Sequence, residues 1–199
     1  MKSSKIINKE TLTVICPVYN EEEVIKLFYK SLKSTLQKIS DNYKSNIIFV
    51  LDKSTDDTLQ ILENLSKKNK EVSVILLSKR FGHQTALLAG LDYCNSDIAI
   101  MMDSDLQHPP SLIPIMLNKY KQGYELVYTI RTDNVDESIL RKFCTKLFYK
   151  FLNYFSDIKL STGEADFRLV SKKVYNLFKK EIREQNPFFR GLFFWVGFN

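Results

Sequence analysis

Apolar runs of strand length alternate along the chain with segments whose apolar residues recur at helical spacing. The first pattern predicts buried strands and the second predicts helices that pack on one face. The predicted strands are residues 12–16, 47–51, 72–77, 98–102 and 126–130. The predicted helices are residues 21–36, a segment after the capping-type residues 54–57, residues 82–93, and a segment from the prolines at 109–114 to residue 121. This alternation predicts an α/β fold with a mostly parallel sheet, right-handed crossovers and helices on both faces.

Individual residues within these elements predict details of helix packing and of the cysteine side chains. The first predicted helix has acidic residues in its first turn, and Leu62 belongs to the apolar face of the second. Small residues such as Gly90 allow the third helix to pack closely against its neighbours. Cys16 and Cys94 fall in apolar segments, so we expect buried, reduced thiols and a cytosolic setting.

Two segments of the second half are rich in aromatic residues. Residues 139–155 place apolar side chains along one stripe and basic side chains elsewhere, which is typical of a helix at a membrane interface and of an ordinary core-facing helix. Residues 187–198 predict either core packing or an apolar surface that meets lipid or a further segment. Residues 1–5 are polar and no apolar region follows them, so we expect no signal peptide. No run approaches the ~20 apolar residues of a membrane-spanning helix.

Composition and charge narrow the classes of protein. The 199 residues are 44% hydrophobic and 26% charged, which predicts one globular domain over residues 1–199. The formal net charge of +6 suits nucleic acid, an anionic membrane or phosphorylated substrates. The basic residues are dispersed and form no recognised nucleic-acid motif, so we expect no nucleic-acid partner. The oligomeric state has no signal in the sequence.

Two carboxylates one residue apart, Asp103 and Asp105, follow the apolar run over residues 98–102. Ligands of open α/β sheets bind beyond the carboxyl ends of the strands, and Mg²⁺ takes one or two protein carboxylates together with phosphate oxygens. The pair therefore predicts a divalent cation that holds a substrate diphosphate, and the alternative is a solvated acidic turn. Residues 17–21 (PVYNE) follow the first strand in place of a GxGxxG motif, so a dinucleotide site is unsupported.

Six motifs in order resemble family-2 glycosyltransferases with the GT-A fold. The most similar group is that of polyprenyl-phosphate glycosyltransferases, such as dolichol-phosphate mannose synthase and bactoprenol glucosyltransferase. The motifs are residues 17–21, 52–58, 81–92, 103–110, 163–169 and 190–198. The resemblance implies a Rossmann-like GT-A catalytic domain over nearly the whole chain. The family pattern continues past its Trp-Val-Gly-Phe segment, so we expect the C-terminal part of that pattern to be missing.

The resemblance also implies a role for each matching residue on the donor side. The donor-binding positions are Pro17, Tyr19, Glu21, Asp52, Asp103 and Gln107. Asp103 and Asp105 match the metal and diphosphate motif, with Asp105 the more direct ligand of Mg²⁺ or Mn²⁺. Asp52 matches a carboxylate that accepts hydrogen bonds from the base or ribose, and a helix cap is its alternative role. Gln107 matches a contact to the diphosphate, and its alternative is a polar turn residue.

On the acceptor side, Asp166 matches the family's proposed general base. Transfer with inversion needs a group that faces the anomeric carbon opposite the leaving diphosphate. A phosphate acceptor is already ionised near neutral pH, so Asp166 would chiefly orient the acceptor or the sugar. Arg168 and Arg190 match positions that bind acceptor or donor phosphate, which guanidinium groups contact through paired hydrogen bonds. The alternatives are a capped turn before a strand over residues 167–170 for Asp166 and surface salt bridges for the arginines.

The chain departs from the family pattern in several places. Residues 51–54 read LDKS where the family often has Asp-Asp-Gly-Ser, so one carboxylate and the turn glycine are gone. His108 stands where an acid is usual, and His83 occupies a helix start where relatives carry cationic or polar side chains. The sequence gives neither histidine a role.

These observations predict an inverting, metal-dependent glycosyltransferase. It would move a hexose-type sugar from a UDP- or GDP-sugar to a polyprenyl phosphate at the cytoplasmic face of a membrane. One alternative is a soluble family-2 transferase that acts on a saccharide acceptor in cell-surface polysaccharide synthesis. Another is a degenerate nucleotide-sugar binder without turnover. The sequence does not choose the sugar or the nucleotide.

Overall fold

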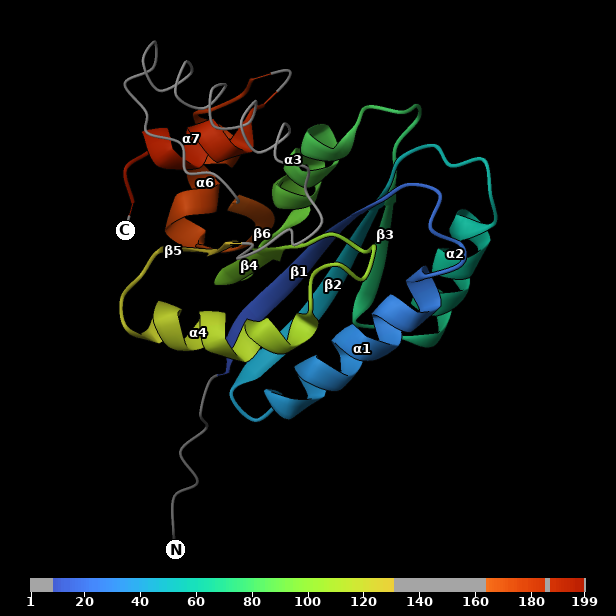
Figure 1. Ribbon diagram of the computed structural model, residues 1–199, viewed down its shortest axis with the longest axis horizontal. Coiled ribbons are helices and arrows are strands. Elements are labelled where there is room, and N and C mark those ends of the chain that lie inside the picture. The colour runs from blue at the N-terminus through green and yellow to red at the C-terminus, as the bar shows by residue number, and fades with distance from the viewer. Residues whose placement is uncertain (1–8, 131–163, 185–186, 199) are drawn as a thin grey trace, which may run out of the picture.

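A mixed sheet of six strands, in the order β3-β2-β1-β4-β6-β5, forms the centre of the molecule (Figure 1). The computed structural model describes residues 9–130, 164–184 and 187–198. The strands are β1 (Glu10–Val18), β2 (Tyr43–Leu51), β3 (Val72–Leu76), β4 (Ile98–Met101), β5 (Leu126–Ile130) and β6 (Glu164–Ser171). The helices are α1 (Ile25–Lys38), α2 (Thr58–Lys68), α3 (His83–Tyr93), the 3₁₀ turn η1 (Pro110–Leu112), α4 (Ile113–Lys121), α6 (Lys172–Lys180) and α7 (Phe189–Trp195).

The first four strands run parallel, and β6 is antiparallel to both of its neighbours, β4 and β5. In the register of the sheet Val18 lies opposite Leu51, and Ile15 lies opposite Met101. The carboxyl ends of β1, β2 and β4 therefore meet at one edge of the sheet. The α/β fold and the mostly parallel sheet predicted from the sequence are confirmed.

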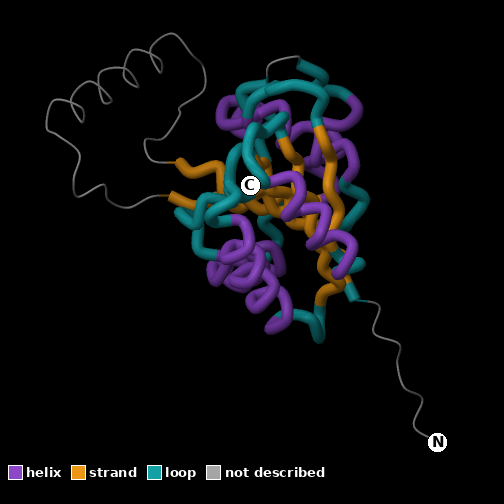
Figure 2. Tube along the Cα trace, turned by 90° about the vertical axis from the view of Figure 1, so that its right-hand side faces the viewer, coloured by secondary structure: helices purple, strands orange, loops and turns teal. Residues whose placement is uncertain are grey.

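Helices cover both faces of this sheet (Figures 1 and 2). On one face α1, α2 and α4 pack into a core that includes Phe28, Leu62 and Met116. On the other face α3, α6 and α7 pack into a second core that includes Leu91 and Phe178. The central strands are buried from both sides and for that reason read as continuous apolar runs in the sequence.

Three local features differ from the sequence prediction. The helix α1 begins at Ile25 and has no acidic residue in its first turn, because Glu21 lies in the preceding turn and its carbonyl accepts from the Ile25 N–H. Asp57 precedes α2 without a side-chain cap, and Asp56 accepts from the Thr58 N–H instead at 3.2 Å. The helix α6 is absent from the prediction, because its lysine-rich ends obscure a short apolar face.

The aromatic segment near residues 187–198 divides between core and surface. Phe189 and Phe193 are fully buried and stack on each other with ring centroids 5.5 Å apart, whereas Phe188 and Trp195 are exposed. Core packing is thus confirmed for the buried side chains, and contact of the exposed ones with lipid or a further segment stays a prediction. Residues 1–5 and 139–155 lie outside the described residues. In the described part of the chain, no helix is long and apolar enough to cross a membrane.

The thiols of Cys16 and Cys94 are free and buried, as predicted. Burial raises the pKa of the Cys16 thiol well above its usual value, and the charge of Asp103 raises it further. The Cys16 side chain is therefore no ready nucleophile, since the thiolate is the reactive form.

Gly90 lies where α3 approaches the sheet most closely. A Cβ atom at this position would stand 2.2 Å from Ile15 Cγ2 and 3.2 Å from Val50 Cγ2. Gly90→Ala is expected to lower the free energy of unfolding by about 1–3 kcal/mol through overpacking, despite the gain of about 1 kcal/mol in helix propensity. Chemical denaturation measures the difference.

The control for Gly90→Ala is Asn64→Ala on the exposed side of α2. This change gains helix propensity without a new contact and should leave stability equal or higher. A Gly90→Ala protein as stable as its parent would show that α3 can move away from the sheet without cost.

Candidate active site

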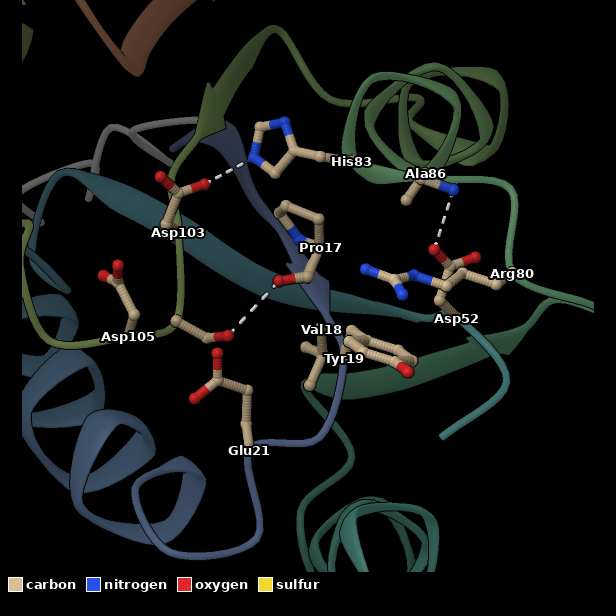
Figure 3. Close-up of a pocket in the computed structure, with 12 residues that line it drawn as sticks. Pro17, Val18, Tyr19, Glu21, Asp52, Arg80, His83, Ala86, Asp103 and Asp105 are labelled. Atoms are coloured by element: carbon tan, nitrogen blue, oxygen red, sulfur yellow. Dashed lines mark hydrogen bonds and ion pairs between the residues drawn. The ribbon is translucent and has the colours of Figure 1, made fainter. Parts of the chain in front are cut away.

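A pocket of about 280 Å³ opens at the carboxyl edge of the sheet, between the loops that follow β1, β2, β3 and β4 (Figure 3). Its walls are Pro17, Val18, Tyr19, Glu21, Asp52, Arg80, Gly82, His83, Ala86, Asp103, Ser104 and Asp105. The structure thus brings together every predicted donor-site and metal residue except Gln107. The Gln107 side chain is exposed, and its backbone N–H donates to Asp105 Oδ1 at 2.9 Å.

The loops after β1 and β2 are joined by hydrogen bonds. Asn20 has a left-handed backbone with φ of 51°, and its side-chain oxygen accepts from the Thr55 N–H at 2.9 Å. Its own N–H donates to the Ser54 hydroxyl at 3.0 Å, and the Glu21 N–H donates to the Thr58 hydroxyl at 2.8 Å. These bonds join the motif at residues 17–21 to the motif at residues 52–58, and the first motif forms one wall of the pocket together with Asp52.

Asp52 is a buried residue of this wall and accepts two backbone hydrogen bonds. Its carboxylate oxygens receive the N–H groups of Phe81 at 2.9 Å and Gly82 at 2.8 Å. Gly82 has φ of 91°, a conformation that favours glycine, and it directly precedes α3. Asp52 is thus no helix cap for α2; it fixes the start of α3 against the end of β2.

Asp52→Asn is expected to lower the free energy of unfolding by about 1–3 kcal/mol, because an amide NH₂ would face one of these backbone donors. Denaturation in urea measures the loss. Asp57→Asn, on an exposed side chain of the same loop, is the control and should change little. Equal effects of the two changes would contradict the structural role of Asp52.

Arg80 and Tyr19 form a stacked pair in the pocket. The guanidinium carbon lies 4.1 Å from the centroid of the Tyr19 ring. The pair offers a flat aromatic surface beside a fixed positive charge, which suits a planar base or an anionic group. Sequence analysis missed Arg80; the available signal was a cation next to the motif at residues 81–92.

Ser104 lies between the two aspartates of the metal motif and is buried. Its hydroxyl donates to the Pro17 carbonyl oxygen at 3.2 Å. This bond ties the loop after β4 to the loop after β1, so the central residue of the motif points into the protein. Asp103 and Asp105, on either side of it, line the pocket (Figure 3).

Three carboxylates, those of Glu21, Asp103 and Asp105, line this part of the pocket. Burial raises the pKa of Glu21, and the charges of Asp105, Asp56 and Asp103 raise it further, in that order. Concentrated negative charge of this kind fits a divalent cation. Among the described residues no group of three or more His, Cys, Asp or Glu side chains is arranged to hold a metal alone. The arrangement fits Mg²⁺ or Mn²⁺ bound by one or two carboxylates together with phosphate oxygens.

Both histidines of the chain contact Asp103. His83 Nε2 lies 2.6 Å from Asp103 Oδ1, and His108 Nδ1 lies 3.5 Å from Asp103 Oδ2. Burial lowers the pKa of His83, but the hydrogen bond and charge of Asp103 outweigh this, so the pKa is raised overall. His108 is buried and stacks on Phe167 with ring centroids 5.5 Å apart. His83 thus bonds the Asp103 carboxylate, whereas His108 Nδ1 accepts from the Asp103 backbone N–H at 3.4 Å and holds the backbone of this residue.

Asp166 lies within β6 rather than in a turn before it. Arg190 donates to both of its carboxylate oxygens, at 3.1 and 3.0 Å, and Arg168 donates to Oδ1 at 3.3 Å. Arg168 is 1% exposed, so its ion pair with Asp166 is no surface salt bridge. Met101, the last residue of β4, pairs with Arg168 of β6, so the loop that carries Asp103 leaves the sheet close to the start of β6. The charges of Asp103 and Asp166 both raise the pKa of His83, which indicates that the two carboxylates lie on the same side of the site.

A family model described as glycosyl transferase family 2 matches residues 13–178, most of the chain. The chain belongs to this family. It is 41% identical over 186 residues to the uncharacterized glycosyltransferase YkcC of Bacillus subtilis (strain 168), across 94% of this chain and 57% of that protein. It is 34% identical over 186 residues to the bactoprenol glucosyl transferase of Shigella phage SfV, across 94% of this chain and 60% of that protein. The chain therefore spans about three fifths of the length of these relatives.

Solved structures of glycosyltransferases share the fold. The mannosyltransferase PcManGT from Pyrobaculum calidifontis, in complex with GDP-Man and Mn²⁺, superposes with a TM-score of 0.58 at 17% identity, over 84% of this chain and 46% of that one. Mannosyl-3-phosphoglycerate synthase from Rubrobacter xylanophilus gives a TM-score of 0.61 at 14% identity, over 83% of this chain and 54% of that one. The GT-A fold implied by the sequence motifs is confirmed.

Proposed function

We propose that residues 1–199 form a catalytic domain that transfers a sugar, with inversion, from a nucleotide-diphosphate donor to a polyprenyl phosphate. The observation that carries the proposal is the pocket at the carboxyl edge of the sheet, whose walls contain a stacked Tyr19–Arg80 pair and the carboxylates of Asp103 and Asp105. The first feature suits a base or an anionic group and the second a cation-bound diphosphate. A nucleotide-sugar presents both chemistries.

The proposed position of the donor follows from where these groups lie in the pocket. Tyr19 and Arg80 lie beside Asp52 on one side of the pocket, and Asp103 lies beside His83 on another (Figure 3). We assign the nucleoside, UDP or GDP, to the first side together with Pro17, and the diphosphate to the second. Asp103 and Asp105 would hold Mg²⁺ or Mn²⁺, which when bound offsets the charge that develops on the leaving diphosphate.

On the acceptor side, Asp166, Arg168 and Arg190 lie next to the diphosphate side through the pairing of β6 with β4. The Arg190 side chain is 36% exposed, so its guanidinium can contact an incoming anion. The ion pair with Asp166 holds that guanidinium in orientation. A phosphate monoester loses its second proton near pH 6 (pKa ≈ 6), so it needs little help from a base. Orientation by Asp166 and Arg190 is therefore the contribution that a phosphate acceptor requires.

A polyprenyl phosphate is the acceptor that the name of one relative supports, and we propose that it is met at the cytoplasmic face of a membrane. The protein of Shigella phage SfV bears the name bactoprenol glucosyl transferase and matches nearly all of this chain. The exposed Phe188 and Trp195 belong to the α7 segment that carries Arg190. Exposed aromatic side chains of this kind suit a membrane interface.

The test is transfer of labelled sugar from UDP- and GDP-sugars to short-chain polyprenyl phosphate and to oligosaccharides, with Mg²⁺, Mn²⁺ or EDTA. We expect metal-dependent labelling of the lipid phosphate and sedimentation of the protein with anionic vesicles. Labelling of the oligosaccharides alone would show that the acceptor is a saccharide, as in polysaccharide synthesis, and not a lipid phosphate. Donor binding without any transfer would mark the chain as a binder of nucleotide-sugars.

A further inference from the structure

A chain of hydrogen bonds connects α7, α3 and the loop after β4. The Phe189 N–H donates to Gln84 Oε1 at 3.3 Å, Gln84 Nε2 lies 3.1 Å from His83 Nδ1, and His83 Nε2 lies 2.6 Å from Asp103 Oδ1. Phe189 is the first residue of α7, and Arg190, the next residue, holds Asp166. These hydrogen bonds thus connect the segment that carries Arg190, on the acceptor side, to the Asp103 carboxylate of the metal motif.

The chemistry of these groups fixes the direction of each bond. A backbone N–H can only donate, so the Gln84 atom that faces Phe189 is the oxygen. The Gln84 amide nitrogen, which can only donate, then faces His83 Nδ1, and that ring nitrogen must accept. Neutral His83 consequently carries its proton on Nε2 and donates to Asp103.

We propose that Gln84 is a positioning residue that holds His83 in the Nε2–H tautomer and ties the start of α7 to Asp103. Through this tie the acceptor-side pair of Asp166 and Arg190 keeps a fixed position relative to the donor-side carboxylate. The opposite tautomer would turn a lone pair of His83 toward the negative Asp103 oxygen and push the carboxylate away. The effect on turnover rests on the proposed function, whereas the tautomer is a property of the folded chain alone.

Two variants separate the parts of this proposal. Gln84→Met keeps the length of the side chain and removes both hydrogen bonds. Gln84→Glu keeps the acceptor for Phe189 and replaces the donor to His83 by a second acceptor, which favours a proton on Nδ1. Gln37→Met, at an exposed position of α1 outside the pocket, is the matched control.

Nitrogen-15 NMR of the imidazole rings at alkaline pH reads the tautomer in the full chain. The chain contains two histidines, and a His83→Phe variant assigns the remaining signals to His108. We expect a protonated Nε2 for His83 in the parent and in Gln37→Met. Asp103 still favours this tautomer in the Gln84 variants, so we expect a measurable share of Nδ1–H in Gln84→Met and a larger share in Gln84→Glu. An unchanged share of the Nε2–H tautomer in Gln84→Glu would overturn the proposal.

Turnover is the second readout. Loss of partners that orient ligating side chains typically lowers activity by about 10- to 100-fold, and we expect a fall of kcat in this range for both Gln84 variants. Thermal melting separates such a fall from unfolding, and Gln37→Met should retain the parent kcat. A parent kcat in both Gln84 variants would overturn the positioning role. If the parent itself transfers no sugar, the proposed function fails and the ring-nitrogen spectra alone decide on Gln84.

Discussion

Asp103→Asn/Asp105→Asn is expected to lose sugar transfer by about 10³-fold, the scale seen when preorganised charge stabilisation is removed from a transition state. Both carboxylates line the pocket, and charge that builds on the leaving diphosphate would no longer be balanced by a bound cation. The fold should persist, because the two side chains lie at the pocket surface rather than in either core. Transfer of labelled sugar at saturating donor and Mn²⁺ measures the loss.

A double variant with the same charge change elsewhere is the control for this prediction. Asp41→Asn/Asp57→Asn neutralises two exposed carboxylates outside the pocket and should retain parent activity. Activity in Asp103→Asn/Asp105→Asn comparable to this control would exclude these aspartates as metal ligands.

The second large effect is expected at Asp166. Asp166→Asn should lower transfer to a phosphate acceptor by about 10²-fold, the scale of the loss when a reacting group is misplaced. The amide would keep one oxygen for Arg168 but turn an NH₂ group toward Arg190, which now makes a paired contact with the carboxylate. Steady-state kinetics with a polyprenyl phosphate acceptor measures the change.

Asp92→Asn is the matched control for Asp166→Asn. Asp92 forms a similar paired contact with Arg183, at 2.6 and 3.1 Å, but on the surface. Its loss should change stability by less than about 1 kcal/mol and leave transfer intact. Asp166→Asn could instead lower transfer by nearly 10⁴-fold and also remove the limb of the pH–rate profile that reports a base. That result would identify Asp166 as a general base and favour a saccharide acceptor.

Strands and long helices were predictable because each is buried on a face that the apolar pattern marks. The strand over residues 126–130 matches β5, and Gly90 marks a close approach of α3 to the sheet. The helix α6 was missed because nine residues with lysines at both ends show too few apolar positions for a clear period. Its signal was Ser171, whose side chain accepts from the Val174 N–H as an N-cap.

Many residues of the candidate site were predictable, but Arg80 was missed, His83 had no assigned role, Gln107 does not line the pocket, and the contacts within the site were not predictable. The positions of Asp103 and Asp105 follow from a strand that ends at a parallel-sheet edge. The two backbone bonds of Asp52 and the stacking of Arg80 on Tyr19 depend on how the loop before α3 folds back, which local sequence does not determine. The link from Phe189 through Gln84 spans more than a hundred residues and becomes visible only in the folded chain.

The measurement that tests the central claim most directly is thermal stability of the chain with UDP, GDP or CDP, each with Mn²⁺, Mg²⁺ or EDTA. A ligand that binds only the folded state adds about 2.7 kcal/mol at a hundred times its dissociation constant, and this shifts the melting temperature measurably. The account predicts a shift that requires one nucleotide and a divalent ion together, and that disappears in Asp103→Asn/Asp105→Asn. An unchanged melting temperature with every pair would contradict a nucleotide-diphosphate site in this pocket.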